Sequence, residues 1–154
     1  MTDPHALARS GDADALATAL DGGLDRNATD ANGYPLLTIA VYNDQPTTTA
    51  LLISRGADPD RLDGGGNTPL MGVAFQGHVD RARDLLDAGA DVARRQPAGM
   101  TALHFAAMGG HEAMADLLVA RGAPTDVRDG RGLTAADLAG ARGQDTLAAR
   151  LRTP

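Results

Sequence analysis

The sequence predicts an all-α solenoid of helix-turn-helix units joined by hairpin-like loops. The main observation is a glycine that returns every 33 residues, at Gly33, Gly66, Gly99 and Gly132. Other columns keep the same step, among them Thr68, Thr101 and Thr134, and Leu37, Leu70 and Leu103. The aromatic share is only 3%, so the core must be built from Ala, Leu and Val, which suits closely packed helices. A fixed step of this size indicates stacked repeats, each of which buries its apolar face only against a neighbour.

The repeat that begins at residue 63 shows the signals for two helices. Thr68 precedes an apolar run and can cap the N-terminus of a first helix, and Pro69 fits the first helical turn, where no N–H is needed. Gly77 suits the left-handed residue that ends this helix. Leu85 then lies on a second helix, and Gly89 ends it before the loop to the next hairpin.

The period divides the chain into one domain. It contains an incomplete N-terminal repeat over residues 1–29, full repeats over 30–62, 63–95 and 96–128, and a C-terminal repeat over 129–154. Two sites depart from the pattern. Asp44 replaces the glycine that ends the first helix, and Asp tolerates left-handed geometry better than most residues. Gln96 replaces the Asp that opens the other hairpins, and we expect a locally altered hairpin there.

Several segments resemble the ankyrin signature, namely Gly66-Asn67-Thr68-Pro69-Leu70, Gly99-Met100-Thr101-Ala102-Leu103-His104-Phe105-Ala106-Ala107, Gly77-His78, Gly110-His111 and Gly89-Ala90-Asp91. The resemblance covers nearly the whole chain. It implies a small protein made only of ankyrin repeats, and it says little about function by itself. It also implies that His78, His104 and His111 are structural residues that form hydrogen bonds between loops or helices.

Composition disfavours several functions. The formal charge is −6, with 20 acidic and 14 basic side chains and no basic block, so no nucleic-acid partner is expected. The chain has no Cys, which excludes disulfides and thiolate metal sites. It shows no signal segment and no run long enough to span a bilayer, so we expect a cytoplasmic protein with no membrane partner. Every basic residue is Arg, and Ala, Gly and Asp are abundant, which is typical of the codon bias of a GC-rich bacterium.

No catalytic, cofactor or metal site is predicted. Asp58 and Asp60, like Asp126 and Asp129, lie in loops where Asp forms turns. The Gly64-Gly65-Gly66 run lacks the preceding strand and the following Lys of a phosphate-binding loop. Zinc-protease and nucleophile-elbow motifs are also missing from the sequence. We therefore expect a protein that is not an enzyme.

The resemblance implies where a partner binds, because ankyrin-like proteins use their hairpin tips and the concave face of their first helices. One column lies on the first helix, nine residues after the repeat glycine, and holds Tyr42, Phe75 and Met108. The hairpin-tip column, one residue after the glycine, holds Tyr34, Asn67, Met100 and Leu133. Asn43 and Gln76 follow the first-helix column, and Met71 lies on the same helix as Phe75.

Three of the four aromatic residues fall in these columns, and Phe105 is expected in the core. Aromatic anchors dominate binding energetics, so the ten residues predict a site for another protein, of which this chain would be an adaptor or regulator. Three alternatives stay open. The columns could pack against neighbouring repeats, the chain could self-associate through the same surface, or the groove could bind a small molecule or carry out chemistry on it. In the last case the lining would be Tyr42, Met71, Phe75, Met108 and His104, with His104 as the titratable group.

Overall fold

The computed structural model describes residues 2–153, and within them it contains ten helices and no extended strand. The first helices of the pairs are α1 (Pro4–Ser10), α3 (Leu36–Tyr42), α5 (Pro69–Gln76), α7 (Ala102–Gly109) and α9 (Ala135–Ala141). The second helices are α2 (Ala13–Asp21), α4 (Pro46–Ser54), α6 (Val79–Asp87), α8 (Glu112–Ala120) and α10 (Asp145–Arg152). From α3 onward the first helices begin 33 residues apart, which is the step of the glycine column.

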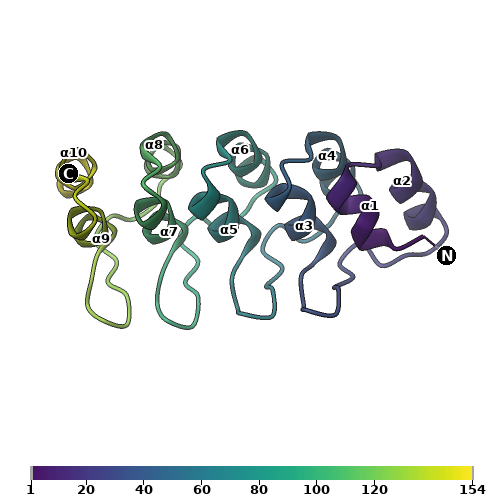
Figure 1. Cartoon of the computed structure of the whole chain (residues 1–154), viewed down its shortest axis with the longest axis horizontal. Helices are drawn as coiled ribbons and strands as arrows, with labels where there is room; N and C mark the ends of the chain where they lie inside the picture. The colour runs from purple at the N-terminus through teal and green to yellow at the C-terminus, as the bar shows by residue number, and fades with distance from the viewer. Residues whose placement is uncertain (1, 154) are drawn as a thin grey trace.

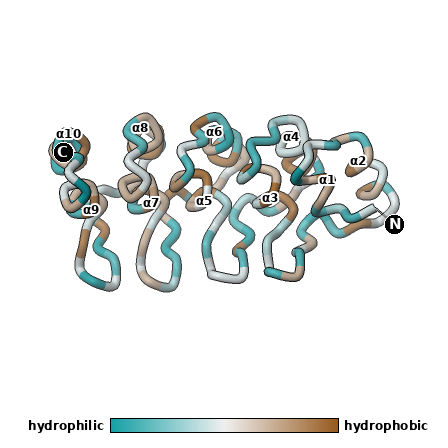
Figure 2. The backbone as a smooth tube through the Cα atoms, in the orientation of Figure 1, coloured by the Kyte–Doolittle hydropathy of each residue, from teal (hydrophilic) through white to brown (hydrophobic). Residues whose placement is uncertain are grey.

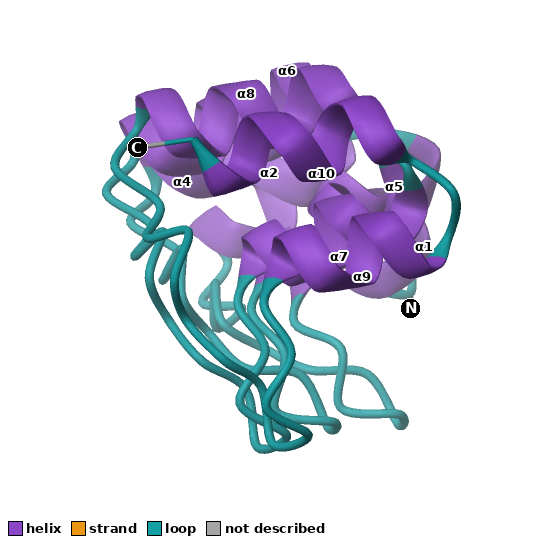
Figure 3. Cartoon of the chain, turned by 90° about the vertical axis from the view of Figure 1, so that its left-hand side faces the viewer, coloured by secondary structure: helices purple, strands orange, loops and turns teal. Residues whose placement is uncertain are grey.

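The five helix pairs stand side by side in chain order, with α1 and α2 at one end and α9 and α10 at the other (Figure 1). The second helices form one layer and the first helices a second layer (Figure 3). The long loops project from the first-helix layer, away from the second helices (Figure 3). This arrangement confirms the predicted all-α solenoid of helix-turn-helix units.

The N-termini of the first helices are held by reciprocal hydrogen bonds. In α5 the Thr68 hydroxyl accepts from the Met71 N–H at 3.3 Å, and the Met71 sulfur accepts from the Thr68 N–H at 3.4 Å. His104 Nδ1 and Asp137 Oδ2 accept from the preceding Thr N–H groups in α7 and α9. These contacts satisfy amide groups that have no partner inside the helix.

The helix α3 lacks this arrangement because its N-cap residue is Pro35. Proline has neither an N–H to donate nor a hydroxyl to accept. The third residue of the helix, Thr38, consequently has no capping partner, and its buried hydroxyl forms no hydrogen bond within the described residues.

The turns between paired helices use left-handed residues, as predicted. Gly77 and Gly110 end α5 and α7 with φ of 82° and 74°. Asp44, which stands in the corresponding place after α3, adopts φ of 51°, so the predicted substitution of Asp for Gly in this geometry is confirmed.

The hairpins share one pattern of main-chain bonds. Asp63 N–H donates to Asn67 O, and Gly66 N–H donates to Asp63 O. The Asp63 carboxylate also accepts from the N–H groups of Gly65 and Asn67. The hairpin that begins at Gln96 was expected to be altered, and this expectation is wrong for the main chain. Gln96 N–H donates to Met100 O at 2.9 Å, as in the other hairpins, and side chains add two bonds: Gln96 Oε1 accepts from Ala98 N–H, and Arg95 Nε donates to Gly99 O at 3.1 Å.

The core lies between the two helix layers and between neighbouring pairs. Leu52, Leu85, Leu118 and Leu151 repeat at the same place on successive second helices and are buried. In the first-helix layer Ala40, Ala74 and Ala107 are fully buried, which allows close packing. Apolar residues accordingly concentrate on the helices and polar residues on the loops (Figure 2).

Polar contacts also join neighbouring pairs. Gln45 donates its side-chain amide to Arg9 O at 3.0 Å, and His111 Nε2 lies 2.9 Å from Phe75 O. The structural role expected for His111 is therefore confirmed.

Candidate functional site

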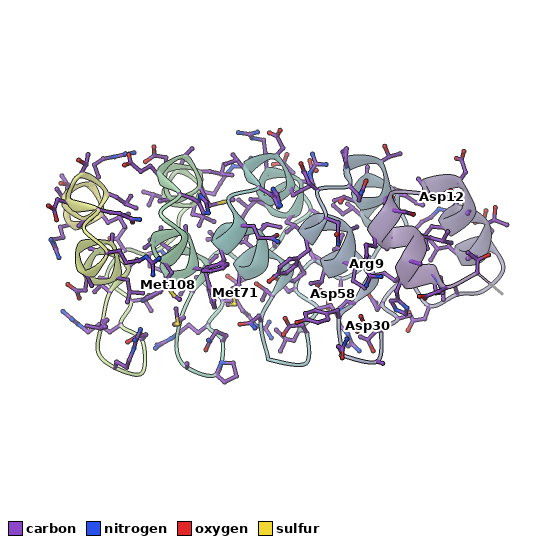
Figure 4. The ribbon with its side chains drawn as sticks, in the orientation of Figure 1. Arg9, Asp12, Asp30, Asp58, Met71 and Met108 are labelled. Atoms are coloured by element: carbon purple, nitrogen blue, oxygen red, sulfur yellow. The ribbon has the colours of Figure 1, made fainter. Side chains whose placement is uncertain are left out.

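The predicted first-helix column lies at or near the C-terminal end of the first helices. Phe75 is 48% exposed and is the most exposed large apolar side chain among the described residues. Tyr42 and Met108 are half-buried, and Asn43 and Gln76 are exposed beside them. Figure 4 shows Met71 and Met108 on the hairpin side of α5 and α7. The hairpins and the first helices meet at this side, so we call it the hairpin-side face.

A first pocket on this face, of about 230 Å³, lies between α1, α3 and the first hairpin, and we call it the tyrosine pocket. Its lining residues are Arg9, Asp30, Tyr34, Thr38, Ile39, Tyr42 and Asn43. It brings an Arg and an Asp together with two aromatic rings, and Figure 4 shows Arg9 and Asp30 on this part of the molecule. Only Tyr34, Tyr42 and Asn43 belong to the predicted site.

A second pocket, also of about 230 Å³, adjoins the first along the stack, and we call it the phenylalanine pocket. Its lining residues are Tyr42, Asn67, Met71, Gly72, Phe75, Phe105 and Met108. Five of them belong to the predicted site, and none is charged. Tyr42 lines both pockets and separates them.

All four aromatic residues of the chain therefore line one or the other of two adjoining pockets. Phe105 was expected in the core, and it packs against the core without being fully buried. Its side chain is only partly buried and forms a wall of the phenylalanine pocket. The helical position correctly places Phe105 against the core but does not show that its outer edge reaches the surface.

Tyr42 packs on the backbone of the next repeat. Gly72 lies inside α5, and a Cβ atom added there would come within 2.7 Å of Tyr42 Cζ and 2.9 Å of the hydroxyl oxygen, and closer still to Cε2. The absence of a side chain at Gly72 thus makes room for the ring. Burial raises the pKa of Tyr42, and the negative charge of Asp63 acts in the same direction.

Two predicted site residues are less accessible than the prediction required. Met71 is 1% exposed and Met100 is 8% exposed. The Met71 sulfur accepts a backbone hydrogen bond, so the side chain forms the floor of the phenylalanine pocket. The prediction that Met71 and Met100 are surface contact residues is therefore wrong, because both side chains lie beneath the surface. Asn67 and Leu133, the other tip residues with Tyr34, are half-buried, whereas Tyr34 is exposed.

His104 does not face the groove, which removes the basis of the predicted site around it. Its side chain is buried, and it lines neither pocket. Nδ1 accepts from Thr101 N–H at 3.1 Å, and Nε2 lies 3.2 Å from Leu133 O, to which it donates. Burial lowers the pKa of His104, and this outweighs the opposing effect of the Leu133 carbonyl. The ring is a neutral structural link between hairpin and helix, as the resemblance implied.

Four functional candidates escaped the sequence argument, namely Arg9, Asp30, Thr38 and Gly72. Arg9 lies in the incomplete first repeat, so it belongs to no column of the repeat. Asp30 has a sufficient role as a turn residue of the first hairpin. A usable signal was present for Thr38, because Pro35 stands where Thr68 and Thr101 cap the following repeats. The paired choice of Tyr42 and Gly72 becomes visible only when neighbouring repeats are placed side by side.

The stacked helix pairs, the projecting hairpins and the pockets between them define a helical repeat solenoid with two adjoining pockets along one side. Residues 44–86 and 73–119 match the family profile described as ankyrin repeats (many copies). The chain belongs to the ankyrin-repeat family, whose repeats generally mediate protein–protein interaction. None of the described helices has the length and apolar character needed to cross a lipid bilayer.

One curated relative shares part of the repeat region. Over 75 residues, or 47% of this chain, the sequence is 39% identical to the E3 ubiquitin-protein ligase XB3 of Oryza sativa subsp. japonica. The match covers 17% of that protein, so this chain spans only a small part of its length.

Proposed function

We propose that this protein is a non-enzymatic interaction module that acts as an adaptor or regulator of a partner protein, binding it through the hairpin tips and the first helices. The observation that carries the proposal is the position of the four aromatic residues, all of which line the two pockets of the hairpin-side face. Aromatic side chains bury large areas and dominate interface energetics, so this face is the best-equipped surface for binding another protein.

The alternatives receive less support. A small-molecule or catalytic site around His104 is disfavoured because that side chain is buried and uses both ring nitrogens within the fold. Packing between repeats explains much of the position of Tyr42, which lies against the next repeat. It does not explain why an aromatic side chain stands at Phe75, which is 48% exposed. Phe75 is therefore the residue on which the proposal is best tested.

The test places a photoreactive phenylalanine analogue at Phe75 or, as the matched control, at Val119. Val119 is 41% exposed on α8, in the layer of second helices on the other side of the stack. In an extract of the source cells, we expect a defined partner to crosslink from position 75 and not from position 119. Equal crosslinking from both positions, or none from position 75, would contradict the proposal. A crosslink to a second copy of this chain would favour self-association instead.

Once the partner is known, Phe75→Ala is compared with Val119→Ala in a direct binding titration. A central aromatic anchor contributes about 2 kcal/mol or more, which corresponds to a loss of affinity of roughly 30-fold. We expect this loss for Phe75→Ala and less than about threefold for Val119→Ala. Because both residues are exposed on the surface and neither belongs to the buried core, the thermal transition should change little in either variant.

A further inference from the structure

The tyrosine pocket contains a buried hydroxyl that has no partner. Thr38 is 1% exposed, and its Oγ1 forms no hydrogen bond within the described residues. An unsatisfied buried polar group is costly, so a ligand group that forms a hydrogen bond with it gains affinity. The residue lines the tyrosine pocket, and because Oγ1 itself is closed to solvent, a ligand in the pocket reaches it only when the pocket wall shifts slightly.

The loss of the internal partner has a local cause. The corresponding residues of the next three repeats are Met71, His104 and Asp137, and each accepts the N–H of its N-cap threonine. In α3 the N-cap is Pro35, which has no N–H. The substitution therefore releases the Thr38 hydroxyl from the capping role that this position has in the other repeats.

Two opposite charges line the same pocket without neutralising each other. Arg9 is exposed on α1, and Asp30 opens the first hairpin. No ion pair within 4.0 Å joins them in the described part of the chain, nor does Arg9 pair there with another carboxylate. Asp30 Oδ1 accepts from the N–H groups of Asn32 and Tyr34, each at 2.9 Å, which leaves Oδ2 to accept from a ligand.

The rest of the pocket is suited to a small apolar group. Ile39 and the rings of Tyr34 and Tyr42 form its apolar walls. Its volume of about 230 Å³ is below the roughly 300–1,000 Å³ of pockets that hold drug-sized ligands, so it is matched to a single residue. A complementary ligand has a carboxylate for Arg9 and Thr38, a neighbouring N–H donor for Asp30, and an apolar side chain.

We propose that the tyrosine pocket binds the α-carboxylate of an apolar amino-acid residue together with its adjacent N–H group. This chemistry has two sources, the C-terminal residue of a protein and a free amino acid. The first source rests on the proposed function, because the binding partner would supply its own chain end. Guanidinium–carboxylate contacts are charge-assisted, so Arg9 should contribute most of the affinity.

The chain offers a selective optical probe of this pocket. It contains two tyrosines and no tryptophan, and both tyrosines line the tyrosine pocket. Tyrosine fluorescence therefore reports directly on its occupancy. The isolated protein is titrated into the millimolar range with N-acetyl-leucine, free leucine and N-acetyl-leucinamide, which has the same side chain but no carboxylate. Backbone amide shifts of Tyr34 and Thr38 in NMR spectra verify the location.

Two variants and one matched control separate the contacts. Arg9→Gln should weaken binding of the acid probes at least tenfold, and Thr38→Val should weaken it about threefold to tenfold. Thr48→Val is the matched control, because the Thr48 hydroxyl is also buried and unpartnered but lies on α4, outside both pockets. It should leave binding unchanged.

Stronger binding of N-acetyl-leucine than of free leucine supports recognition of a chain end, and the reverse order supports a free amino acid. Equal binding of N-acetyl-leucinamide overturns the inference, as does binding that survives Arg9→Gln or no binding of either acid probe. The titration uses the isolated chain, so it can succeed or fail independently of crosslinking from Phe75. Loss of crosslinking with intact probe binding would count against the adaptor proposal and leave the free amino acid as the source.

Discussion

Replacement of Gly72 by alanine would test the packing that places Tyr42 between the two pockets. Alanine is favoured over glycine inside a helix by about 0.5–1 kcal/mol. The added Cβ would, however, come within 2.7 Å of Tyr42 Cζ, so the ring or the helix must move. Overpacking of this kind costs about 1–3 kcal/mol, which exceeds the helical gain. We therefore expect Gly72→Ala alone to destabilise the protein.

The effect of Gly72→Ala on the free energy of unfolding should change sign when the Tyr42 ring is removed. In a Tyr42→Ala background the new methyl group meets no ring, so Gly72→Ala should stabilise by about 0.5–1 kcal/mol. The coupling energy between the two sites is then the overpacking cost, about 1–3 kcal/mol. Urea unfolding of the four proteins measures it, and thermal unfolding should show shifts of roughly 2–4 °C per kcal/mol for a chain of this size.

Gly140→Ala is the matched control for this cycle. Gly140 lies in α9, and a Cβ atom there would have its nearest neighbour at 3.7 Å, which is an ordinary contact. This substitution should stabilise by the helical gain alone, whatever residue is present at position 42. If Gly72→Ala has the same effect with and without the Tyr42 ring, the proposed contact is refuted.

Three further predictions concern buried polar groups. Burial lowers the pKa of His104, so protonation favours the unfolded chain; the stability that His104 confers is present above its ordinary pKa of 6.5 and is lost as the pH falls below it. His104→Gln should flatten the change in urea midpoint between about pH 7 and pH 5. Thr38→Val and Thr48→Val each remove an unsatisfied hydroxyl and should raise the free energy of unfolding by about 1 kcal/mol, measured by urea titration. Burial raises the pKa of Tyr42 above its ordinary value of 10.0, so stability is present below that pH and declines above it. Tyr42→Phe should reduce this alkaline loss in thermal melts.

These predictions fail in recognisable ways. An unchanged acid response in His104→Gln would show that the ring is not held neutral by burial. Destabilisation by both Thr→Val changes would show that the two hydroxyls have partners. The alkaline measurement is simplified because the chain has no Lys and no Cys. Equal alkaline loss in Tyr42→Phe would therefore assign the effect to a group other than Tyr42.

Much of the fold follows from local rules that a single sequence displays. Thr68 and Gly77 bound α5 because capping and left-handed geometry restrict residue type at helix ends. The glycine at every 33rd residue then places successive repeats in one register. Asp44 shows that the same reasoning extends to a departure, since the left-handed residue was expected from its position alone.

The candidate site was harder to predict because a repeat column shows which face of a helix a residue lies on but not how deeply its side chain is buried. Met71 and Phe75 lie one helical turn apart on α5, yet the first is buried and the second is exposed. The Met71 sulfur accepts from the Thr68 N–H, so this side chain lies toward the start of the helix, whereas Phe75 lies near its end. Arg9 and Asp30 come together from two elements that share no column, so periodicity could not pair them.

The hairpin at Gln96 shows which residues of the hairpins can be substituted while the fold is kept. It keeps the same main-chain bonds without the aspartate that the other hairpins carry, and the Gln96 side chain replaces the carboxylate as the acceptor from the N–H two residues on. The main-chain part of this closure therefore does not depend on an aspartate at the start of the loop. New side chains can be tried at these ends while the scaffold stays intact, so a change of binding partner does not require a new fold.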